Sequence, residues 1–362
     1  HLLHFFKRYY EYSNEFIKLS NTLGERFDLV QAGGGNTSFK LSDFMFIKSS
    51  GSLLSDIDIN KNYVGVNYKN ITKNITKKLI TITEKNKKRR EYTCNYIINK
   101  SIFFLKKYKP SIETSLHSIT KKFTVHIHPI QFNMISSHID CNNIIESLFN
   151  KDEYCILEYC TPGIDTTLAL LSIYNNQQII FLKNHGIVVT SNTVDELQKT
   201  LQYCLDTLET YVQYDFSKYK FVNTISDTMA DIFNTKYISY LSEDSCIHTI
   251  VNQYTNNLFS ICTPDTLIYC GMDIIKINKK DTIVLSIHKY KQEYNDSPKI
   301  FLIKYNEEYM TYITSTSINK CRQIESVFKS HLMCNNKQNK SLDKNEIKYL
   351  NNWEAEKYRK CI

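Results

Sequence analysis

Histidines in two short segments of the sequence have the spacing that metal binding requires. His126 and His128 lie in FTVHIHP, an alternating, β-rich segment that predicts a strand ending at Pro129. Residues i and i+2 of a strand point to the same side, so both imidazoles can reach one ion. His185, beside Gly186 in IIFLKNHGIVVT, is the natural candidate for a third ligand. Three histidines that leave one coordination position open are typical of catalytic zinc sites.

Pairs of histidines in a strand also occur in ordinary cores and surfaces, and alone they favour that interpretation. Here they belong to an ordered series of motifs: AGGGNTSFK (32–40), KSSG (48–51), PSIETSLH (110–117), HIHP (126–129) and KNHG (183–186). This order resembles the class II aldolase/adducin family, notably the long branch that is similar to the aldolase part of rhamnulose-1-phosphate aldolase/alcohol dehydrogenase fusions. The resemblance covers residues from about 15 to 212 and is weaker in TPDTLIYCG (263–271) and WEAEKYR (353–359).

The resemblance implies a role for each conspicuous residue. His126, His128 and His185 would bind zinc or another divalent metal, and Glu113 would be the carboxylate that transfers protons. The substrate phosphate would be held by Gly35, Asn36, Ser50 and Gly51, with Ser111 joining them. The chain would then be a zinc-dependent class II aldolase, an aldehyde-lyase that cleaves a ketose 1-phosphate reversibly to dihydroxyacetone phosphate and an aldehyde.

Family members of this kind also imply an assembly. They form cyclic tetramers, so the resemblance predicts a homotetramer with active sites between subunits. A tyrosine from a neighbouring subunit would protonate the leaving aldehyde, but no motif singles out one of the 26 tyrosines.

Each of these residues also has a simpler interpretation. Consecutive glycines let backbone N–H groups approach an anion, but a glycine run alone more commonly marks a tight turn. Glu113 falls in the first turn of a predicted helix, where a carboxylate also stabilises the positive end of that helix. His117 lies one helical turn after Glu113, and we expect it to pack beside the site rather than act as a fourth ligand.

Other classes of function remain open. An epimerase or dehydratase of the same fold would reuse the metal and phosphate sites with other proton-transfer groups. An adducin-like binding module needs no catalysis, but it has no physical reason to gather three histidines and Glu113 around one cavity. A fused dehydrogenase domain is not expected, because Gly271 is the only glycine after Gly186 and a dinucleotide site needs a glycine-rich turn.

Composition restricts the partners of the chain. The net charge of +8 over 362 residues accompanies abundant Lys, Asn, Ile and Tyr, as in an AT-biased genome. The basic run KKLITITEKNKKRR (77–90) lacks interleaved stacking aromatics, so we expect a solvated surface there and no nucleic-acid partner. No apolar run is long enough to span a membrane, and no secretory signal is expected at the start. Eleven cysteines without a CxxC pair favour a reducing, cytoplasmic location.

Periodicity predicts the elements that must position these residues. Apolar spacings of three and four predict helices over residues 1–20, from Val194 to Val212, and around Cys321 to Phe328. Further helices are expected at 96–107 and at 111–119, the latter with Ser111 as N-cap. The expected β-type segments are FDLV (27–30), MFIKS (45–49), the two halves of IIFLKNHGIVVT, LIYCG (267–271), TIVLSIH (282–288), KIFLIKY (299–305) and TYITST (311–316).

The expected fold class is α/β. The resemblance implies a class II aldolase-like three-layer αβα domain with a central, mostly antiparallel sheet, which we assign to residues 1–220. A smaller α/β region of unknown role follows over residues 221–362. The boundary falls where the helical pattern loosens, at about residues 214–228.

Overall fold

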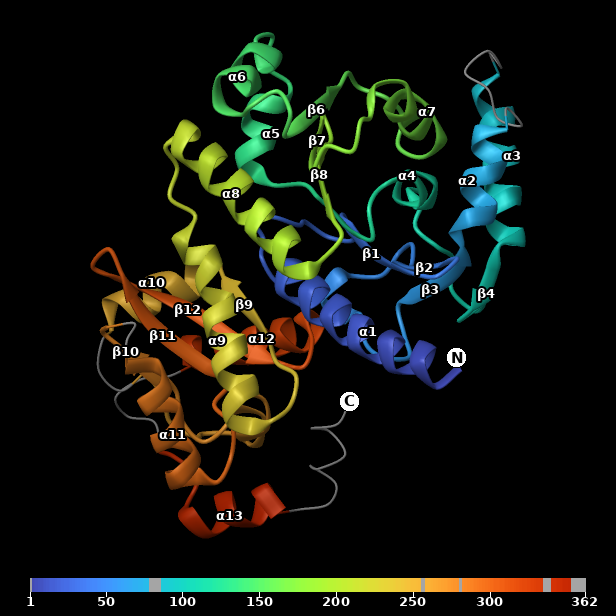
Figure 1. Ribbon diagram of the computed structural model, residues 1–362. Coiled ribbons are helices and arrows are strands. Elements are labelled where there is room, and N and C mark those ends of the chain that lie inside the picture. The colour runs from blue at the N-terminus through green and yellow to red at the C-terminus, as the bar shows by residue number, and fades with distance from the viewer. Residues whose placement is uncertain (1, 78–85, 255–257, 280–281, 335–339, 353–362) are drawn as a thin grey trace. The chain divides into compact units, whose positions relative to one another are not determined.

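The chain forms two compact units, His1–Phe216 and Ser217–Ile362, in a computed structural model (Figure 1). The residues that the structure describes are 2–77, 86–254, 258–279, 282–334 and 340–352. Most of the basic run at 77–90 and all of the WEAEKYR motif lie outside these residues. Each unit contains its own sheet.

Eight strands form the sheet of the first unit, in the order β4-β3-β2-β1-β5-β8-β7-β6. Their bounds are β1 (Asn36–Leu41), β2 (Phe44–Lys48), β3 (Tyr63–Asn67), β4 (Ile102–Phe104), β5 (Phe123–Ile127), β6 (Tyr154–Leu157), β7 (Ile179–Leu182) and β8 (Gly186–Ser191). Every neighbouring pair is antiparallel except β6 with β7. The prediction of a central, mostly antiparallel sheet is confirmed.

Helices cover both faces of this sheet, which confirms the three-layer αβα architecture (Figure 1). One layer contains α1 (Leu2–Gly24), α5 (Ile130–Ser136), α6 (Cys141–Leu148) and α8 (Val194–Val212). The other contains α2 (Tyr68–Thr76), α3 (Lys87–Lys100), α4 (Thr114–Ile119) and α7 (Ile164–Ile173). A short 3-10 turn, η1 (Leu54–Asp56), connects β2 to β3.

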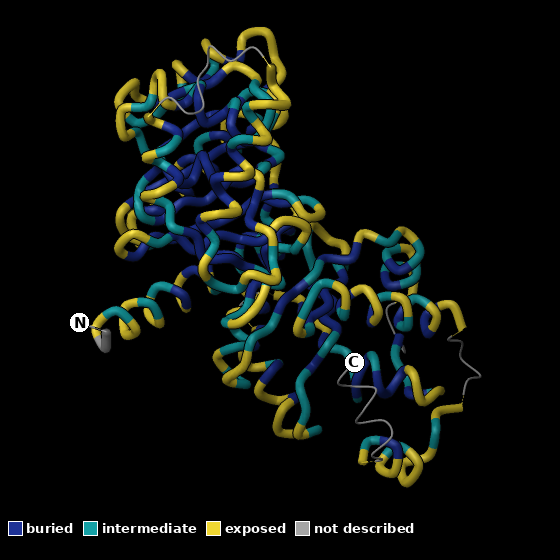
Figure 2. The backbone as a smooth tube through the Cα atoms, turned by 90° about the vertical axis from the view of Figure 1, so that its right-hand side faces the viewer, coloured by how far each residue is buried: buried dark blue, intermediate teal, exposed yellow. Residues whose placement is uncertain are grey.

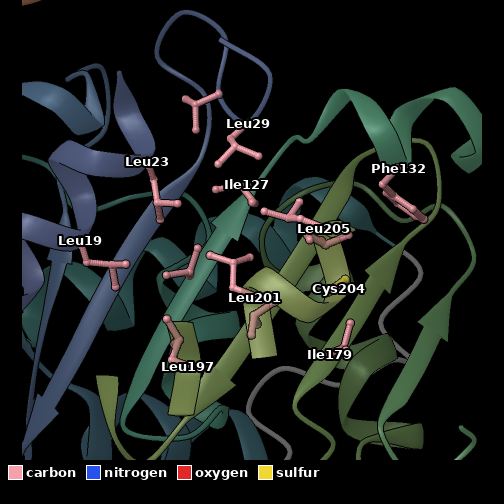
Figure 3. Packing of buried hydrophobic residues seen from close by; sticks show 14 of the residues in the cluster. Leu19, Leu23, Leu29, Ile127, Phe132, Ile179, Leu197, Leu201, Cys204 and Leu205 are labelled. Atoms are coloured by element: carbon pink, nitrogen blue, oxygen red, sulfur yellow. The ribbon is translucent and has the colours of Figure 1, made fainter. Parts of the chain in front are cut away.

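The core between the sheet and the first layer is apolar. Leu19 and Leu23 of α1 and Leu201 and Leu205 of α8 pack with Ile127 of β5 in one cluster of buried side chains (Figure 3). Each such burial contributes roughly 1.5–3 kcal/mol relative to an exposed side chain. Figure 2 shows that the backbone in the interior of the first unit is the buried part, with exposed segments around it.

The opposite face of the same central strands is polar. Because strand residues alternate, Asn36, Ser38 and Lys40 of β1 face away from the apolar core and towards the helix α4 and its flanking turns. The neighbouring strands add Thr124 and His126 on β5 and Thr190 on β8, and all of these side chains are buried. This buried polar face, named here the polar face, contains the residues that could do chemistry.

The two long helices of the first unit form as predicted. The helix expected over 1–20 is α1, and the helix expected at Val194–Val212 is α8. The side chain of Thr193 accepts a hydrogen bond from the backbone of Glu196 and so caps the start of α8. The helix ends at Gln213, which adopts a left-handed conformation with φ of 54°.

The helix expected at 96–107 is wrong in its position. The helix begins at Lys87, after the N-cap Asn86, and it ends at Lys100. The next residues form β4 at the edge of the sheet, where Ile102 and Phe104 pair with Val66 and Gly65. An edge strand rich in Ile and Phe pairs with β3 there, and this pairing overrides the helical spacing.

Three segments that were expected to be β-type are not strands. FDLV (27–30) is a turn, in which the backbone N–H groups of Leu29 and Val30 donate to the carbonyl of Arg26. TIVLSIH falls largely in the helix α11 (Ile283–Tyr294), whose buried Ile283, Ile287 and Tyr290 have helical spacing. LIYCG falls in a π-helical turn, η2 (Thr266–Cys270). β-branched residues suggested a strand in TIVLSIH, but the burial of one face of α11 favours the helix.

The second unit has a sheet of four strands in the order β10-β11-β12-β9. Its elements are α9 (Ser217–Phe233), β9 (Ile238–Ser242), α10 (Ser245–Gln253), η2, β10 (Ile275–Ile277), α11, β11 (Ile300–Tyr305), β12 (Glu308–Ser315), α12 (Ile318–Cys334) and α13 (Lys344–Asn352). The strands predicted at 299–305 and 311–316 and the helix containing Cys321 and Phe328 are confirmed. The helix α9, in the stretch where the pattern loosens, was not predicted.

Two further findings concern the whole described chain. Among the described residues, no helix combines the length and the apolar character needed to cross a bilayer. The ten described cysteines are free thiols, and six of them are buried.

Candidate metal centre

Three histidines converge at one end of the polar face. His126 is on β5, His128 follows the end of that strand, and His185 lies in the connection between β7 and β8. The Nε2 atom of His126 lies 3.0 Å from Nε2 of His128 and 3.3 Å from Nε2 of His185. One nitrogen from each ring lies within 4.8 Å of the other two. The structure therefore brings together the three residues that the sequence predicted as ligands.

Burial keeps all three imidazoles neutral. It lowers the pKa of His126 to about 4. Burial, and then the nearby His126, lowers the pKa of His128 and of His185 to about 4. The Nδ1 atom of His126 lies 3.0 Å from the carbonyl oxygen of Ile187. A carbonyl only accepts, so Nδ1 carries the proton and the Nε2 lone pair of His126 points into the cluster.

The spacing of these nitrogens fits a tetrahedral metal ion. With zinc–nitrogen bonds of about 2.0–2.1 Å, two ligand nitrogens at the tetrahedral angle lie roughly 3.3–3.4 Å apart. The observed separations from His126 are 3.0 Å and 3.3 Å. Neutral imidazoles gathered around one point are also a donor set that zinc and similar divalent ions prefer. The three histidines therefore provide the donor set of a divalent metal, and the two separations from His126 are close to those of a tetrahedral site.

Two glycines leave room for the imidazole rings. A Cβ atom at Gly186 would lie 2.3 Å from the carbonyl oxygen of Ile127 and 2.8 Å from Cδ2 of His128. A Cβ atom at Gly34 would lie 2.8 Å from Nδ1 of His128. Any side chain at either position would displace the ring or the strand. The glycines of AGGGN and KNHG thus have a steric role in the metal centre, which the sequence interpretation had not assigned to Gly34.

Glu113 lies beside the histidines. Its side chain is buried, and its Oε2 atom lies 3.3 Å from Nε2 of His126 and accepts a hydrogen bond of 2.7 Å from Nδ2 of Asn36. Its Oε1 atom lies 3.7 Å from Nε2 of His185 and has no hydrogen-bond partner. A buried carboxylate oxygen without a donor is costly unless a metal or substrate completes the site.

Glu113 stands at the N-cap position of α4, next to the positive end of that helix. Glu113 precedes α4 instead of lying in its first turn, and its carboxylate makes no capping hydrogen bond. The backbone N–H of Glu113 donates to Oγ of Ser111, at 3.2 Å. Ser111 was expected to cap a helix beginning at residue 112, but α4 begins at Thr114. The turn at 111–113 instead holds Glu113 so that its side chain faces the histidines.

The residues predicted to hold a phosphate lie on loops next to this centre. Gly35 precedes β1 and Asn36 begins it, Ser50 and Gly51 follow β2, and Ser111 precedes α4. Gly35 and Gly51 have φ values of 69° and 78°, in the left-handed region that favours glycine. The side-chain amide of Asn36 is bonded to Glu113, so its clearest role in this structure is to hold that carboxylate.

Backbone hydrogen bonds connect the loops that contain these residues. The N–H of Ser111 donates to the carbonyl of Lys48 at 3.1 Å, and the N–H of Ser50 donates to the carbonyl of Lys109 at 2.8 Å. Ser50 and Gly51 remain exposed, whereas Ser111 is buried. The loop that follows β2 and the loop that precedes α4 therefore lie side by side, with Ser50 and Gly51 at the surface.

Lys48 is a charged residue of the site that the sequence interpretation quoted without assigning a role. It is buried, and its ammonium group donates to the carbonyl oxygens of Gly33 and Ser49, each at 3.3 Å. Burial lowers the pKa of Lys48 to about 8, and the charge of Glu113 opposes this shift. The signal was present in the sequence, because a lysine that begins the KSSG motif places a cation beside a predicted phosphate loop.

His117 is not one of the converging ligands. It is fully buried on α4, and its Nδ1 atom lies 2.7 Å from the hydroxyl oxygen of Ser38, while Nε2 has no hydrogen-bond partner. Burial, and then the nearby His126 and Lys40, lowers the pKa of His117 well below its usual value. Its place in the packing of α4 against β1 agrees with the expectation that it lies beside the site.

The fold and the histidine cluster together define an α/β protein with a candidate three-histidine metal site. The sequence profile of the Class II Aldolase and Adducin N-terminal domain family matches residues 14–212, more than half of the chain. The chain therefore belongs to the class II aldolase/adducin family. No curated protein matches the sequence significantly.

Solved structures similar to the chain include three from microorganisms. The N-terminal class II aldolase domain of a conserved protein from Thermoplasma acidophilum is 23% identical, with a TM-score of 0.47, over 55% of this chain and 92% of that one. A sugar-phosphate aldolase from Thermotoga maritima is 12% identical, with a TM-score of 0.42, over 57% and 95%. An L-fuculose-1-phosphate aldolase from Thermus thermophilus is 15% identical, with a TM-score of 0.37, over 55% and 93%.

Proposed function

We propose that the chain is a zinc-dependent sugar-phosphate aldolase, which cleaves a ketose 1-phosphate reversibly to dihydroxyacetone phosphate and an aldehyde. The observation that carries this proposal is the buried carboxylate of Glu113. One of its oxygens lacks a hydrogen-bond partner, and both lie within 3.7 Å of a histidine nitrogen. A base beside a metal centre is what proton transfer at a carbon atom requires.

His126, His128 and His185 would hold the divalent ion, which supplies Lewis-acid polarisation of the substrate oxygens. Glu113 transfers the proton. After the C3–C4 bond breaks, its carboxyl group donates a proton to C3, and in the reverse direction the carboxylate removes that proton. Asn36 holds Oε2 through its hydrogen bond and leaves Oε1 to act. The side chain is thereby oriented before the substrate arrives.

The phosphate of the substrate would lie on the loops that follow β2 and precede α4. The hydroxyls of Ser50 and Ser111 and the backbone N–H of Gly51 would donate to such a group, because the backbone N–H groups of Ser50 and Ser111 already donate to carbonyls. Gly35 would let the backbone approach the phosphate without a Cβ atom. The ammonium group of Lys48 adds a positive charge below these loops. A phosphate there stabilises the charged form of Lys48, whose burial otherwise opposes it.

The assembly remains part of the proposal. We infer a cytoplasmic homotetramer, in which a tyrosine of a neighbouring subunit protonates the aldehyde oxygen in the direction of synthesis and takes up that proton in the direction of cleavage. Sedimentation at micromolar concentration tests this directly, because a fully active monomer contradicts it. Activity that depends on protein concentration through dissociation of the oligomer supports it.

Turnover of a panel of ketose 1-phosphates, with and without zinc, tests the activity. An aldolase releases dihydroxyacetone phosphate from at least one member of the panel. An epimerase changes the configuration of a sugar phosphate without releasing that product, and a dehydratase releases water. A protein with full metal content and no turnover of any kind supports the adducin-like binding module. His138 is exposed and is not part of the histidine cluster, so His138→Ala is the matched histidine control.

A further inference from the structure

A pocket lies on the polar face, away from the metal centre and near the C-terminal ends of β1 and α4. It has a volume of about 620 Å³, and its lining includes Lys40, Tyr68, Lys69 and Lys121. Lys40 is four residues beyond Asn36 on β1, so it lies roughly 13 Å along the strand from the metal centre. None of the residues assigned to the metal centre or its phosphate loops lines this pocket.

Two lysines of this pocket share one aromatic ring. The ammonium nitrogen of Lys40 lies 4.9 Å from the ring centroid of Tyr68, and that of Lys69 lies 5.3 Å from the same centroid. Lys40 is 6% exposed, and its ammonium group donates to the carbonyl of Thr120, just beyond the end of α4. Two positive charges are therefore held near one another, and one of them is buried.

Negative charge is missing from the lining. No aspartate or glutamate is among the described residues that line the pocket, and no described carboxylate forms an ion pair with Lys40 or Lys69. The other two lysines of the lining act elsewhere. Hydrogen bonds from Ser191 and Gln178 lower the pKa of Glu196 most, and the charge of Lys121 adds to this shift. The ammonium group of Lys122 donates to the hydroxyl of Tyr12.

A buried ammonium group without a counter-ion is unfavourable. Burial, and then the charge of Lys69, lowers the pKa of Lys40 to about 7. An anion between the two ammonium groups would offset both effects, since it replaces lost solvation and screens the repulsion. The carbonyl of Thr120 alone satisfies one donor of the three that a lysine carries.

We propose that this lysine pocket binds a small phosphorylated anion. Two ammonium groups match the charge of a phosphate monoester, which is close to −2 at neutral pH. Ser42 and Asn192 at the rim add a hydroxyl and an amide. The hydroxyls of Thr72 and Ser118 donate to main-chain carbonyls, so the lysines provide most of the binding. The proposal is independent of the aldolase activity.

The geometry favours a small anion over a nucleic acid. The pocket contains one aromatic ring, that of Tyr68, and the two ammonium groups already lie beside it. A base would need a free aromatic face for stacking. In addition, Lys40 is buried at the base of the pocket, where a phosphate can reach it more readily than a continuous backbone can.

Titration of the full chain with inorganic phosphate, followed by ³¹P nuclear magnetic resonance, tests the proposal. A Lys48→Met/His128→Ala protein provides the background, because it lacks both the cation below the proposed substrate-phosphate loops and one ligand of the metal centre, so phosphate binding at that site is weakened. We expect Lys69→Gln and Lys40→Met, each in that background, to weaken phosphate binding by at least about tenfold, as for loss of a charge-assisted contact. Lys73→Gln is the matched control, since Lys73 is exposed one turn further along α2 and does not line the pocket.

The outcomes are distinct. Phosphate binding that is lost with either pocket lysine and kept in Lys73→Gln supports the pocket, whether or not the chain is an aldolase. Equal phosphate affinity in all these proteins overturns it. Binding of a single-stranded RNA with the same lysine dependence, and none of phosphate, also overturns it in favour of a nucleic-acid surface. Lys69 is exposed, so a folding defect in Lys40→Met leaves Lys69→Gln as the decisive variant.

Discussion

The two faces of β1 and β5 are both buried but differ in polarity. On one face, Phe39 and Val125 pack among the leucines of α1 and α8. On the other face, Asn36, Lys40 and His126 are buried just as completely, but among polar groups. The same two strands therefore provide an apolar surface and a polar one of similar burial.

This contrast indicates that the two faces have different roles. The apolar face contributes to the free energy of folding through burial of hydrocarbon. The polar face stabilises the fold less, because each buried polar group must recover its lost solvation through a partner. Glu113 Oε1 and His117 Nε2 have no such partner. The proposed function gives Glu113 a chemical reason to be kept in spite of this cost, so substitutions on the two faces should affect different quantities.

The largest effect is expected from loss of the metal ligands. The double variant His126→Ala/His128→Ala should lose most of its metal, and turnover should fall by about 10⁴ or more, because the polarising ion is gone. Metal content is measured by mass spectrometry on purified protein, where the unmodified chain should hold close to one divalent ion per chain. Full metal occupancy in the double variant would contradict the assignment of the ligands, and His138→Ala should behave as the unmodified chain.

The next effect separates proton transfer from structure. Glu113→Gln keeps the shape and the hydrogen-bonding reach of the side chain but cannot accept a proton, so turnover should fall by roughly 10²–10⁴. The melting temperature and the metal content should change little. If Glu113→Gln retains full turnover, Glu113 is not the base. Parallel measurement of a hydroxamate that mimics the enediolate should show that ligand binding survives.

The third effect belongs to the apolar face. Phe39 is fully buried between two residues that point to the polar face, Ser38 and Lys40. Phe39→Ala should lower the free energy of unfolding by about 3–5 kcal/mol, because it removes buried hydrocarbon and leaves a cavity. Urea unfolding measures this loss. Metal content per folded molecule should stay unchanged, and a variant that lost its metal without losing stability would break the proposed division between the faces.

The smallest effect depends on pH. The pKa of Lys40 is lowered to about 7 in the folded chain from an ordinary value of 10.5, so below pH 7 its buried charge opposes folding in full. Between pH 7 and 10.5 the unfolded chain binds the proton more tightly, and stability rises with pH. Lys69 is the charge that adds to this shift.

Lys40→Met should therefore raise the melting temperature by a few degrees at pH 6, roughly 2–4 °C per kcal/mol in a chain of this size. The gain should shrink steadily towards pH 10. Thermal unfolding at several pH values, in buffers without phosphate, measures it. A gain that stays constant with pH would mean that Lys40 does not carry the buried charge.

The sequence predicted which histidines come together, because most of that geometry is local. The i, i+2 spacing of His126 and His128 needs only that residues 123–127 form a strand, and the structure places them on β5. His185 required the family resemblance, because no local pattern says which loop meets the end of β5. Asn36 was expected at the phosphate, but its amide holds Glu113 across 77 residues of sequence, a contact that no spacing indicates.

The fold was predictable where periodicity was strong and long. The helix α8 has eight spaced apolar residues and a Thr193 cap, and its bounds agree with the prediction. Predictions for short segments were wrong. In TIVLSIH and LIYCG the residue types favour a strand, whereas the structure has helical turns there. The lysine pocket was also beyond prediction, because Lys40 and Lys69 come from different elements and meet only through the ring of Tyr68.

The pairing of β1 with β5 has a consequence for how the chain avoids misfolding. Asn36 lies opposite His126, and each strand alternates between apolar and polar residues. A slip of one residue would turn His126 into the leucine layer and Val125 into the metal centre, so such a state is strongly disfavoured. A slip of two residues keeps both faces and separates His126 from Asn36. A slip by an odd number of residues is therefore disfavoured because it would bury polar side chains in the apolar core. A slip by an even number keeps the core and disrupts only the site. Such a slip would leave a folded protein that binds no metal.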